Sequence, residues 1–250
     1  MFAIYKKEMR SYFINAIGYV YIAVFLAISA FVCCFTTLQM QSYEVSTYFW
    51  IMICALVVLI PLLTMKLFSE ERKLRTEQLL MTAPVTITGM VVAKFLAAFT
   101  MFAGTVLISC INFYPLYKLA DEARAADEYA EITSKLGPNT AIIVGNLVGM
   151  LLVGAAFIAV GVFISALTEN QLVAAVATIG ILLAMVVIGV LNNYIDNYAV
   201  RFMLSWMSVL NRFANFGYGI FDFNALLYYI SICTVFLFLT IRVYEKRRWG

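Results

Sequence analysis

Six long apolar runs constrain the fold of this 250-residue chain more than any other feature. A helix that crosses a lipid bilayer needs about 20 consecutive, mostly apolar residues. The runs that reach this length are Ile17–Leu38, Tyr48–Phe68, Met90–Tyr117, Thr140–Leu167, Leu172–Leu191 and Ala225–Val243. Because lipid offers no hydrogen-bond partners to the backbone, each run is expected to be a helix. They use most of a chain that is 64% hydrophobic and 12% charged. We therefore predict an all-α integral membrane protein with six transmembrane helices, in which residues 1–250 form a single domain.

The basic residues are distributed unequally between the two sides of this predicted bundle. Twelve would share one side with both termini: Lys6, Lys7, Arg10, Lys66, Arg72, Lys73, Arg75, Lys94, Arg242, Lys246, Arg247 and Arg248. The opposite side would hold the remaining five: Lys118, Arg124, Lys135, Arg201 and Arg212. Cytosolic loops of membrane proteins carry the excess of Lys and Arg. We therefore predict a multi-pass membrane protein with both termini in the cytosol. The net charge of +3 then reflects topology and does not indicate nucleic-acid binding.

Residues 1–16 are predicted to form an interfacial helix. Three cations fall on one helical face, and an apolar stripe of Phe2, Tyr5, Met9, Tyr12 and Phe13 falls on another. A short helix of this kind lies along the membrane surface. Within it we select Phe2, Tyr5, Lys6, Met9 and Arg10 as interfacial contacts. The alternative is a charged flank that only fixes orientation. The apolar run that follows is too long for a removable signal sequence.

Groups that carry out chemistry are scarce in the predicted spans. The chain has no histidine, and its five cysteines lack metal-ligand spacing. No GxxxxGK[ST] nucleotide loop is present. Asp, Glu and Arg are absent from the middle of every run, and Lys66 and Lys94 are expected to extend their amines toward the membrane surface. We therefore predict no catalytic, cofactor-binding or metal site in this chain. Any work that it performs must draw energy from a partner.

The loop between the second and third runs is charged and patterned. Residues 69–84 are predicted to form a short cytosolic helix that ends at Pro84. A helix with both charge signs and a few apolar side chains can dock in a groove of another protein. The residues assigned to this contact are Glu70, Glu71, Arg72, Lys73, Arg75, Thr76, Glu77, Leu79, Leu80 and Met81. The alternative is a solvated turn that only orients the flanking spans.

The stretch PLLTMKLFSEERKLRTEQLLMTAPVTITGMVVAKFLA, Pro61 to Ala97, resembles the corresponding part of ABC-2 type permeases. The resemblance is closest to the gliding-motility-type permease subunits. The opening MFAIYKKEMRSYFINAIGYVYIAVF is similar to the start of that family. Many relatives have Gly where this chain has Arg75, so the local backbone is expected to differ there.

The resemblance implies the membrane half of an ATP-driven exporter. The expected partners are a dimer of ABC ATPase subunits and a second permease subunit, which makes a homodimer or a heterodimer. In gliding-motility-type systems one partner often has a large extracytoplasmic domain. ATP and Mg²⁺ would be bound by the ATPase, with segment 69–84 as its coupling helix and the interfacial helix as a further contact. The remaining surroundings would be the lipid bilayer of the bacterial cytoplasmic membrane.

An aromatic segment precedes the sixth run. Residues 192–224 are too apolar for an ordinary exposed loop and are interrupted by Gly217 and Gly219. We predict an extracytoplasmic re-entrant helical hairpin there, with a gate formed by Phe202, Met203, Trp206 and Phe213. The alternative is an aromatic belt at the membrane interface with no gating role.

Two other classes of function stay open on the sequence. The chain could be a non-transporting membrane scaffold that anchors a partner complex. A membrane-embedded enzyme has less support, because no span holds a charged pair or a metal-binding cluster. The substrate of a transporter cannot be derived from this sequence.

Overall fold

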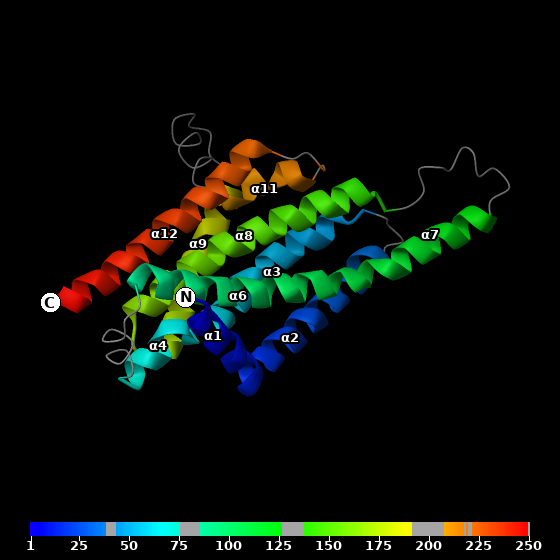
Figure 1. Cartoon of the computed structure of the whole chain (residues 1–250). Helices are drawn as coiled ribbons and strands as arrows, with labels where there is room; N and C mark the ends of the chain where they lie inside the picture. The colour runs from blue at the N-terminus through cyan, green and yellow to red at the C-terminus, as the bar shows by residue number, and fades with distance from the viewer. Residues whose placement is uncertain are drawn as a thin grey trace, which may run out of the picture.

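The computed structural model describes residues 1–38, 44–75, 86–126, 138–191, 208–217, 219 and 222–249 (Figure 1). Within these ranges the regular structure is entirely helical, without a strand. This agrees with the all-α class predicted from the sequence.

Six helical segments are long and apolar enough to cross a membrane. They are Ala16–Thr37, Ser46–Lys73, Ile87–Glu122, Thr140–Leu167, Gln171–Leu191 and Phe223–Arg248. Each corresponds to one predicted apolar run. The described part of the chain therefore has the architecture of a multi-pass membrane protein.

Shorter elements interrupt or extend these spans. The first half contains α1 (Phe2–Ile14), α2 (Ala16–Cys33), the π-helix η1 (Cys34–Leu38), α3 (Ser46–Thr64) and α4 (Lys66–Lys73). Next come α6 (Ile87–Ser109), the 3₁₀-helix η2 (Cys110–Phe113), α7 (Tyr114–Ala126) and α8 (Thr140–Leu167). The chain ends with α9 (Gln171–Leu191), α11 (Val209–Gly217) and α12 (Phe223–Trp249).

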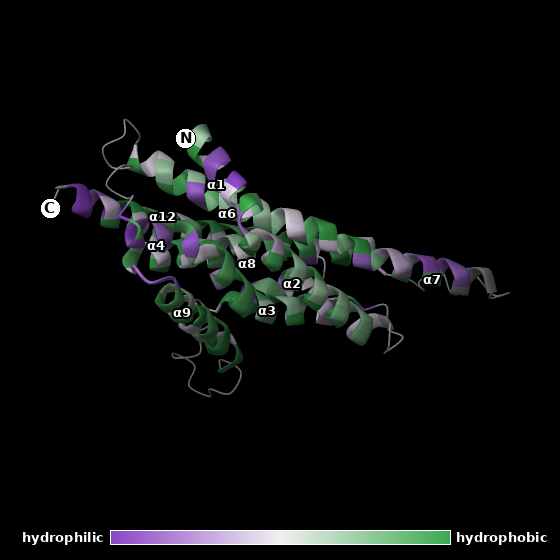
Figure 2. Cartoon of the chain, turned by 90° about the horizontal axis from the view of Figure 1, so that it is seen from below, coloured by the Kyte–Doolittle hydropathy of each residue, from purple (hydrophilic) through white to green (hydrophobic). Residues whose placement is uncertain are grey.

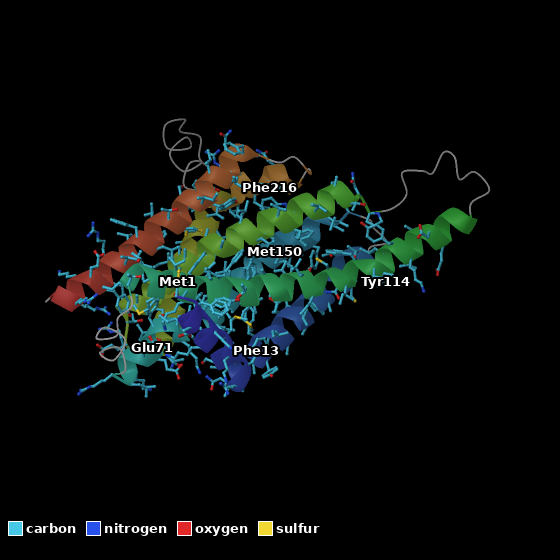
Figure 3. The ribbon with its side chains drawn as sticks, viewed as in Figure 1. Met1, Phe13, Glu71, Tyr114, Met150 and Phe216 are labelled. Carbon is cyan, nitrogen blue, oxygen red and sulfur yellow. The ribbon has the colours of Figure 1, made fainter. Side chains whose placement is uncertain are left out.

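Helix α8 forms the centre of the bundle and packs against α3, α4, α6, α9, α11 and α12. It has no charged residue over 28 positions, and Met150 near its middle is 1% exposed (Figure 3). Small residues let its neighbours approach closely. A Cβ atom at Gly161 would collide with the side chain of Thr64 on α3, so glycine is required for this contact.

Helices α9 and α12 lie at the outside of the bundle. Only 22% and 11% of their most apolar windows are buried within the chain, against 67% for α8. Apolar side chains that are exposed on a spanning helix face lipid or another membrane protein, so these two helices form much of the outer surface.

The two ends of the bundle differ in polarity. Both termini and α4 lie at one end, and α7 projects from the other (Figure 1). Hydrophilic residues are concentrated at these ends and on α1, while the middle is apolar (Figure 2). The segment Ile87–Glu122 has 36 residues and would be about 54 Å long as a helix, longer than the ~30 Å hydrocarbon core. Helix α7 is thus the part that extends beyond a membrane.

Candidate functional site

The candidate site is the junction at which α1, α4, α6 and α8 meet. It contains the first residues of the predicted coupling segment. Helix α3 ends at Thr64, and the chain turns at Met65 before α4 begins at Lys66. A helix leaves its first backbone N–H groups without hydrogen-bond partners inside the helix. Because α4 begins inside the bundle, these groups need an acceptor from another element.

Ser165 on α8 supplies that acceptor. Its hydroxyl accepts hydrogen bonds from the backbone N–H groups of Phe68 (3.2 Å) and Ser69 (3.3 Å). It also donates to the carbonyl oxygen of Met65 at 3.2 Å. One buried side chain on the central helix therefore caps the start of α4 and fixes its position against the bundle.

Lys94 on α6 is the electrostatic centre of the junction. Its amine lies 2.8 Å from a carboxylate oxygen of Glu71 on α4 and 3.2 Å from one of Glu8 on α1. It donates to the carbonyl of Leu67, and it lies 4.7 Å from the centre of the Phe68 ring. The side chain is only 1% exposed. Charged groups from three helices are thus joined through one buried cation.

The other oxygen of Glu71 accepts from the amine of Lys7 on α1 at 3.1 Å. Lys7, Glu8, Glu71 and Lys94 together carry two positive and two negative formal charges. Such balance is needed at a buried site because an uncompensated charge there is strongly unfavourable. Figure 3 shows Glu71 at the end of the bundle that also holds Met1.

The prediction that Lys94 extends its amine toward the membrane surface was wrong. The amine is buried inside the bundle, because two carboxylates and a carbonyl offer it better partners than solvent would. Sequence reasoning also missed Glu8 and Ser165. A lone lysine inside an apolar run was the available signal for the ion pair, since an ionisable residue within a span usually has a partner.

The C-terminal end of α8 is held by arginine side chains. Arg72 on α4 donates to the carbonyl of Leu167 at 2.8 Å and pairs with Glu169 at 2.8 Å. Arg247 on α12 donates to the carbonyl of Ala166 at 2.8 Å. Cations near a helix C-terminus satisfy its free carbonyls and complement its dipole. Arg72 therefore also links α4 to the central helix.

Helix α1 is fixed by polar contacts on its inner face. The hydroxyl of Tyr5 donates to Thr100 on α6 (3.2 Å), and that of Tyr12 donates to the carbonyl of Leu63 on α3 (3.1 Å). Burial raises the pKa of the Tyr12 hydroxyl well above its usual value. Met9 also packs inward, where its sulfur accepts from Thr100 at 3.3 Å. The predicted apolar stripe of α1 is therefore divided, because Phe2 and Phe13 remain 76% and 45% exposed.

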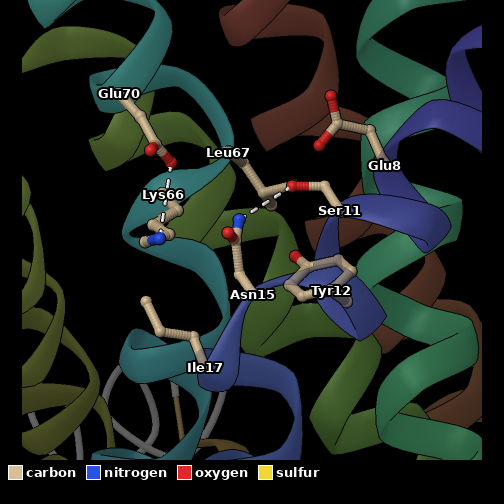
Figure 4. A pocket seen from close by; sticks show the side chains of 8 residues that line it. All are labelled: Glu8, Ser11, Tyr12, Asn15, Ile17, Lys66, Leu67 and Glu70. Atoms are coloured by element: carbon tan, nitrogen blue, oxygen red, sulfur yellow. Dashed lines mark hydrogen bonds and ion pairs between the residues drawn. The ribbon is translucent and has the colours of Figure 1, made fainter.

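A small cavity lies between α1 and α4 (Figure 4). Its volume is about 30 Å³, which is enough for one water molecule. Its lining is mostly polar: Glu8, Ser11, Tyr12, Asn15, Lys66 and Glu70, with Ile17 and Leu67. On its walls Asn15 donates to Ser11 at 3.3 Å, and Lys66 pairs with Glu70 at 3.7 Å. The two short helices thus meet through polar groups.

The end of α4 is exposed. The helix ends at Lys73, and Arg75 adopts a left-handed backbone with φ of 56°, a conformation that favours glycine. Lys73 and Arg75 are exposed, and Leu74 between them is 65% exposed. Of the predicted coupling residues, Glu71 and Arg72 instead turn toward the bundle. Thr76, Glu77, Leu79, Leu80, Met81 and the rest of segment 76–84 lie outside the described residues.

The predicted outer gate is only partly described. Phe213 on α11 is fully buried, with its ring 5.4 Å from that of Trp50 on α3 in an edge-to-face arrangement. A Cβ atom at Gly149 of α8 would lie 2.8 Å from the Phe213 ring, so α11 packs tightly on the central helix. Phe202, Met203 and Trp206 lie outside the described residues.

The junction holds charged, hydroxyl and backbone groups that join α1, α4, α6 and α8 through hydrogen bonds and ion pairs. Among the described residues, no group of three or more His, Cys, Asp or Glu side chains is placed to hold a metal ion. No protein-family model matches the chain, and no curated protein matches it either.

Proposed function

We propose that this chain is the transmembrane permease subunit of an ATP-driven exporter of the ABC-2 type, in which a separate ATPase subunit supplies the energy. In this proposal the termini and α4 face the cytosol of a bacterium. The permease acts with a second permease subunit, and the exported substrate is not identified.

The supporting observation is the way in which α4 is held. Its exposed end, Lys73 to Arg75, lies at the end of the bundle where the basic residues are concentrated. Its inward side is joined to α1, α6 and α8 through Glu71, Arg72 and the Ser165 cap. A push on the exposed end would therefore move several spans together. A turn that only connects two spans has no need for these contacts.

The break between α3 and α4 would allow α4 to tilt relative to α3. Pro61 removes one backbone donor from the last turn of α3, and the helix ends three residues later. Pro61 itself is buried. A short rigid helix joined to a long one at such a break can tilt without unfolding either helix, and its ion pairs pass the tilt to α1 and α6.

The test uses Leu74, an exposed apolar side chain at the end of α4. The tagged full-length chain is purified from its native membranes, and co-purified ATPase subunits are identified and quantified. Leu74→Asp places a carboxylate in the proposed contact and should weaken association by ~3–5 kcal/mol, the cost of an unpaired buried charge. Leu119→Asp on α7 makes the same change at the opposite end, at a residue that is 46% exposed.

We expect Leu74→Asp to lose the ATPase while Leu119→Asp keeps it. Equal recovery of an ATPase with both variants would contradict the coupling role of α4. If a partner complex co-purifies but the chain does not change any ATP hydrolysis, the scaffold function is supported instead.

A further inference from the structure

The outer face of α1 holds cations that the rest of the described chain leaves unused. Lys6 and Arg10 are exposed, and within the described residues neither makes an ion pair or hydrogen bond through its side chain. This differs from the inner face, where Glu8 and Tyr12 are both bonded to other helices. The contacts of that inner face prevent α1 from rotating, so the direction of the outer cations is fixed.

These cations border a hollow of about 510 Å³ on the surface of α1. Its polar lining consists of Lys6, Lys7, Arg10, Ser11 and Asn15. Ala3 and Ile14 supply the apolar remainder, so no carboxylate lines it. Since Lys7 already pairs with Glu71, Lys6 and Arg10 provide the two uncompensated charges. The hollow therefore favours an anionic group.

Large apolar side chains share this outer face with the cations. Phe2, Phe13 and Ile14 are 76%, 45% and 69% exposed. At 3.6 residues per turn, they lie with Lys6 and Arg10 within an arc of about 120°. Exposed cations beside exposed aromatic and aliphatic groups are typical of a helix that inserts apolar side chains between lipids.

The position of the hollow along the chain indicates its depth in the membrane. The first span begins at Ala16, and Asn15, which lines the hollow, precedes it directly. The hollow therefore lies where the chain enters the hydrocarbon, at the level of the lipid headgroups. Figures 1 and 2 show α1 running across the direction of the long helices, as a helix in the plane of the membrane would.

An apolar hollow lies on the other side of Phe2. It has a volume of about 430 Å³ between α1 and α6, and its lining includes Met1, Phe2, Tyr5 and Leu96. A lipid whose headgroup contacts the cations could place an acyl chain there. The two hollows together match an amphiphile with an anionic head and an apolar tail.

We propose that the outer face of α1 is a binding site for an anionic phospholipid, with Lys6 and Arg10 as the residues that contact its phosphate. The proposal does not depend on the transport function, because it concerns a contact with the membrane itself. Bound lipid would hold α1 at the membrane surface and, through Lys7 and Glu8, would stabilise the junction with α4.

The test compares lipid preference in the full-length chain purified in a neutral detergent. Native mass spectrometry measures binding from an equimolar mixture of phosphatidylglycerol and phosphatidylcholine. A basic residue near an anionic membrane surface contributes about fivefold in affinity, so the pair should contribute about 30-fold. We expect the wild-type chain to prefer phosphatidylglycerol and K6Q/R10Q to lose about 30-fold of that preference.

Two control variants isolate the site. K73Q/R75Q removes two exposed cations from α4 at the same end of the bundle and should keep the preference. K6R/R10K conserves the charges and should keep it too. Because Lys6 and Arg10 have no partners in the described structure, K6Q/R10Q should fold normally. If the double variant does not fold, K6Q and R10Q alone should each cost about fivefold.

Three results would overturn the proposal. The first is equal binding of the two lipids by the wild-type chain. The second is a loss of preference in K73Q/R75Q equal to that in K6Q/R10Q. It would show that the lipid preference comes from the overall positive charge of this end of the bundle and not from a site on α1. The third is an unchanged lipid preference in K6Q/R10Q together with loss of a co-purified protein, which would make this face a protein contact.

Discussion

Lys94 shows how one residue determines the arrangement of several elements. A lysine in an apolar helix could extend along the surface, but here it is 1% exposed between Glu8 and Glu71. Removing one partner from a buried ion pair leaves an uncompensated charge and costs about 3–5 kcal/mol. Lys94 has two such partners. Its loss would therefore remove the ion pairs that join α1 and α4 to α6.

We predict that Lys94→Met lowers the melting temperature of the full-length chain in detergent by on the order of 10 °C. The cause is the loss of the cation that pairs with Glu8 and of one of the two cations that pair with Glu71. Lys66→Met is the matched control, because Lys66 forms a longer pair with Glu70 at 3.7 Å on one helix face. Such a pair contributes only about 0.3–0.5 kcal/mol.

Neutralising Glu8 and Glu71 in the Lys94→Met variant tests whether their unbalanced charges cause the loss of stability. Lys94→Met combined with Glu8→Gln and Glu71→Gln should recover most of the lost stability. A melting temperature for Lys94→Met equal to that of the control would show that the network does not stabilise the junction.

The sequence indicated which residues of the junction were unusual but not how they meet. Charges near Glu71 were evident in the sequence, and Lys94 was the only charge in its apolar run. Its partner Glu8 lies on a different helix, 86 positions earlier, and the rotation of α1 decides whether Glu8 faces α6 or solvent. Composition and spacing contain no information on that rotation. Ser165 was missed for the same reason, because a serine in a span usually bonds to its own helix.

At the scale of elements, the close contact of α3 with α8 depends on the absence of a side chain at Gly161. We predict that Gly161→Ala lowers stability by about 1–3 kcal/mol, because the added methyl would overlap Thr64 at the α3–α4 break. Since this break positions α4, partner-dependent activity should fall as well. Thermal unfolding of the full-length chain measures the first effect.

Gly180→Ala is the control on α9, where an added Cβ atom would meet nothing within 4 Å. Alanine is the better helix former by up to about 1 kcal/mol, so this variant should be neutral or stabilising. A larger loss of stability in Gly180→Ala than in Gly161→Ala would contradict the packing described for α8.

Element boundaries were predictable where polarity changes abruptly. The run Thr140–Leu167 has the same bounds as α8, because polar residues flank it on both sides. The sixth run was too short, since α12 continues through Lys246, Arg247 and Arg248 to Trp249. The apolar pattern indicates which residues lie within the membrane. It does not indicate where a helix ends, because a helix can continue beyond the membrane. In the same way α6 continues through η2 into α7, which extends beyond the end of the third run at Tyr117.

At the scale of the whole molecule, the described spans explain the position of the termini. Six crossings return a chain to the side on which it began, and both termini lie at one end of the bundle (Figure 1). On α12, Phe223 and Arg242 are 19 residues apart, or about 29 Å along a helix, close to the thickness of the hydrocarbon core. We therefore expect the boundary of the membrane near the C-terminus to lie close to Arg242.

The distribution of basic residues then predicts the orientation. All twelve that were assigned to the side of the termini lie on α1, α3–α4, α6 or α12 or directly after α4, and we expect this end to face the cytosol. The native cysteines are first replaced, and single cysteines are introduced at Arg75 and Lys118, which are exposed near opposite ends. An impermeant maleimide applied to intact cells should label position 118 and not position 75. Disrupted cells should show labelling at both. Labelling of both positions in intact cells would contradict the six-span topology, while labelling of position 75 alone would place the termini and α4 outside, where no cytosolic ATPase could reach them.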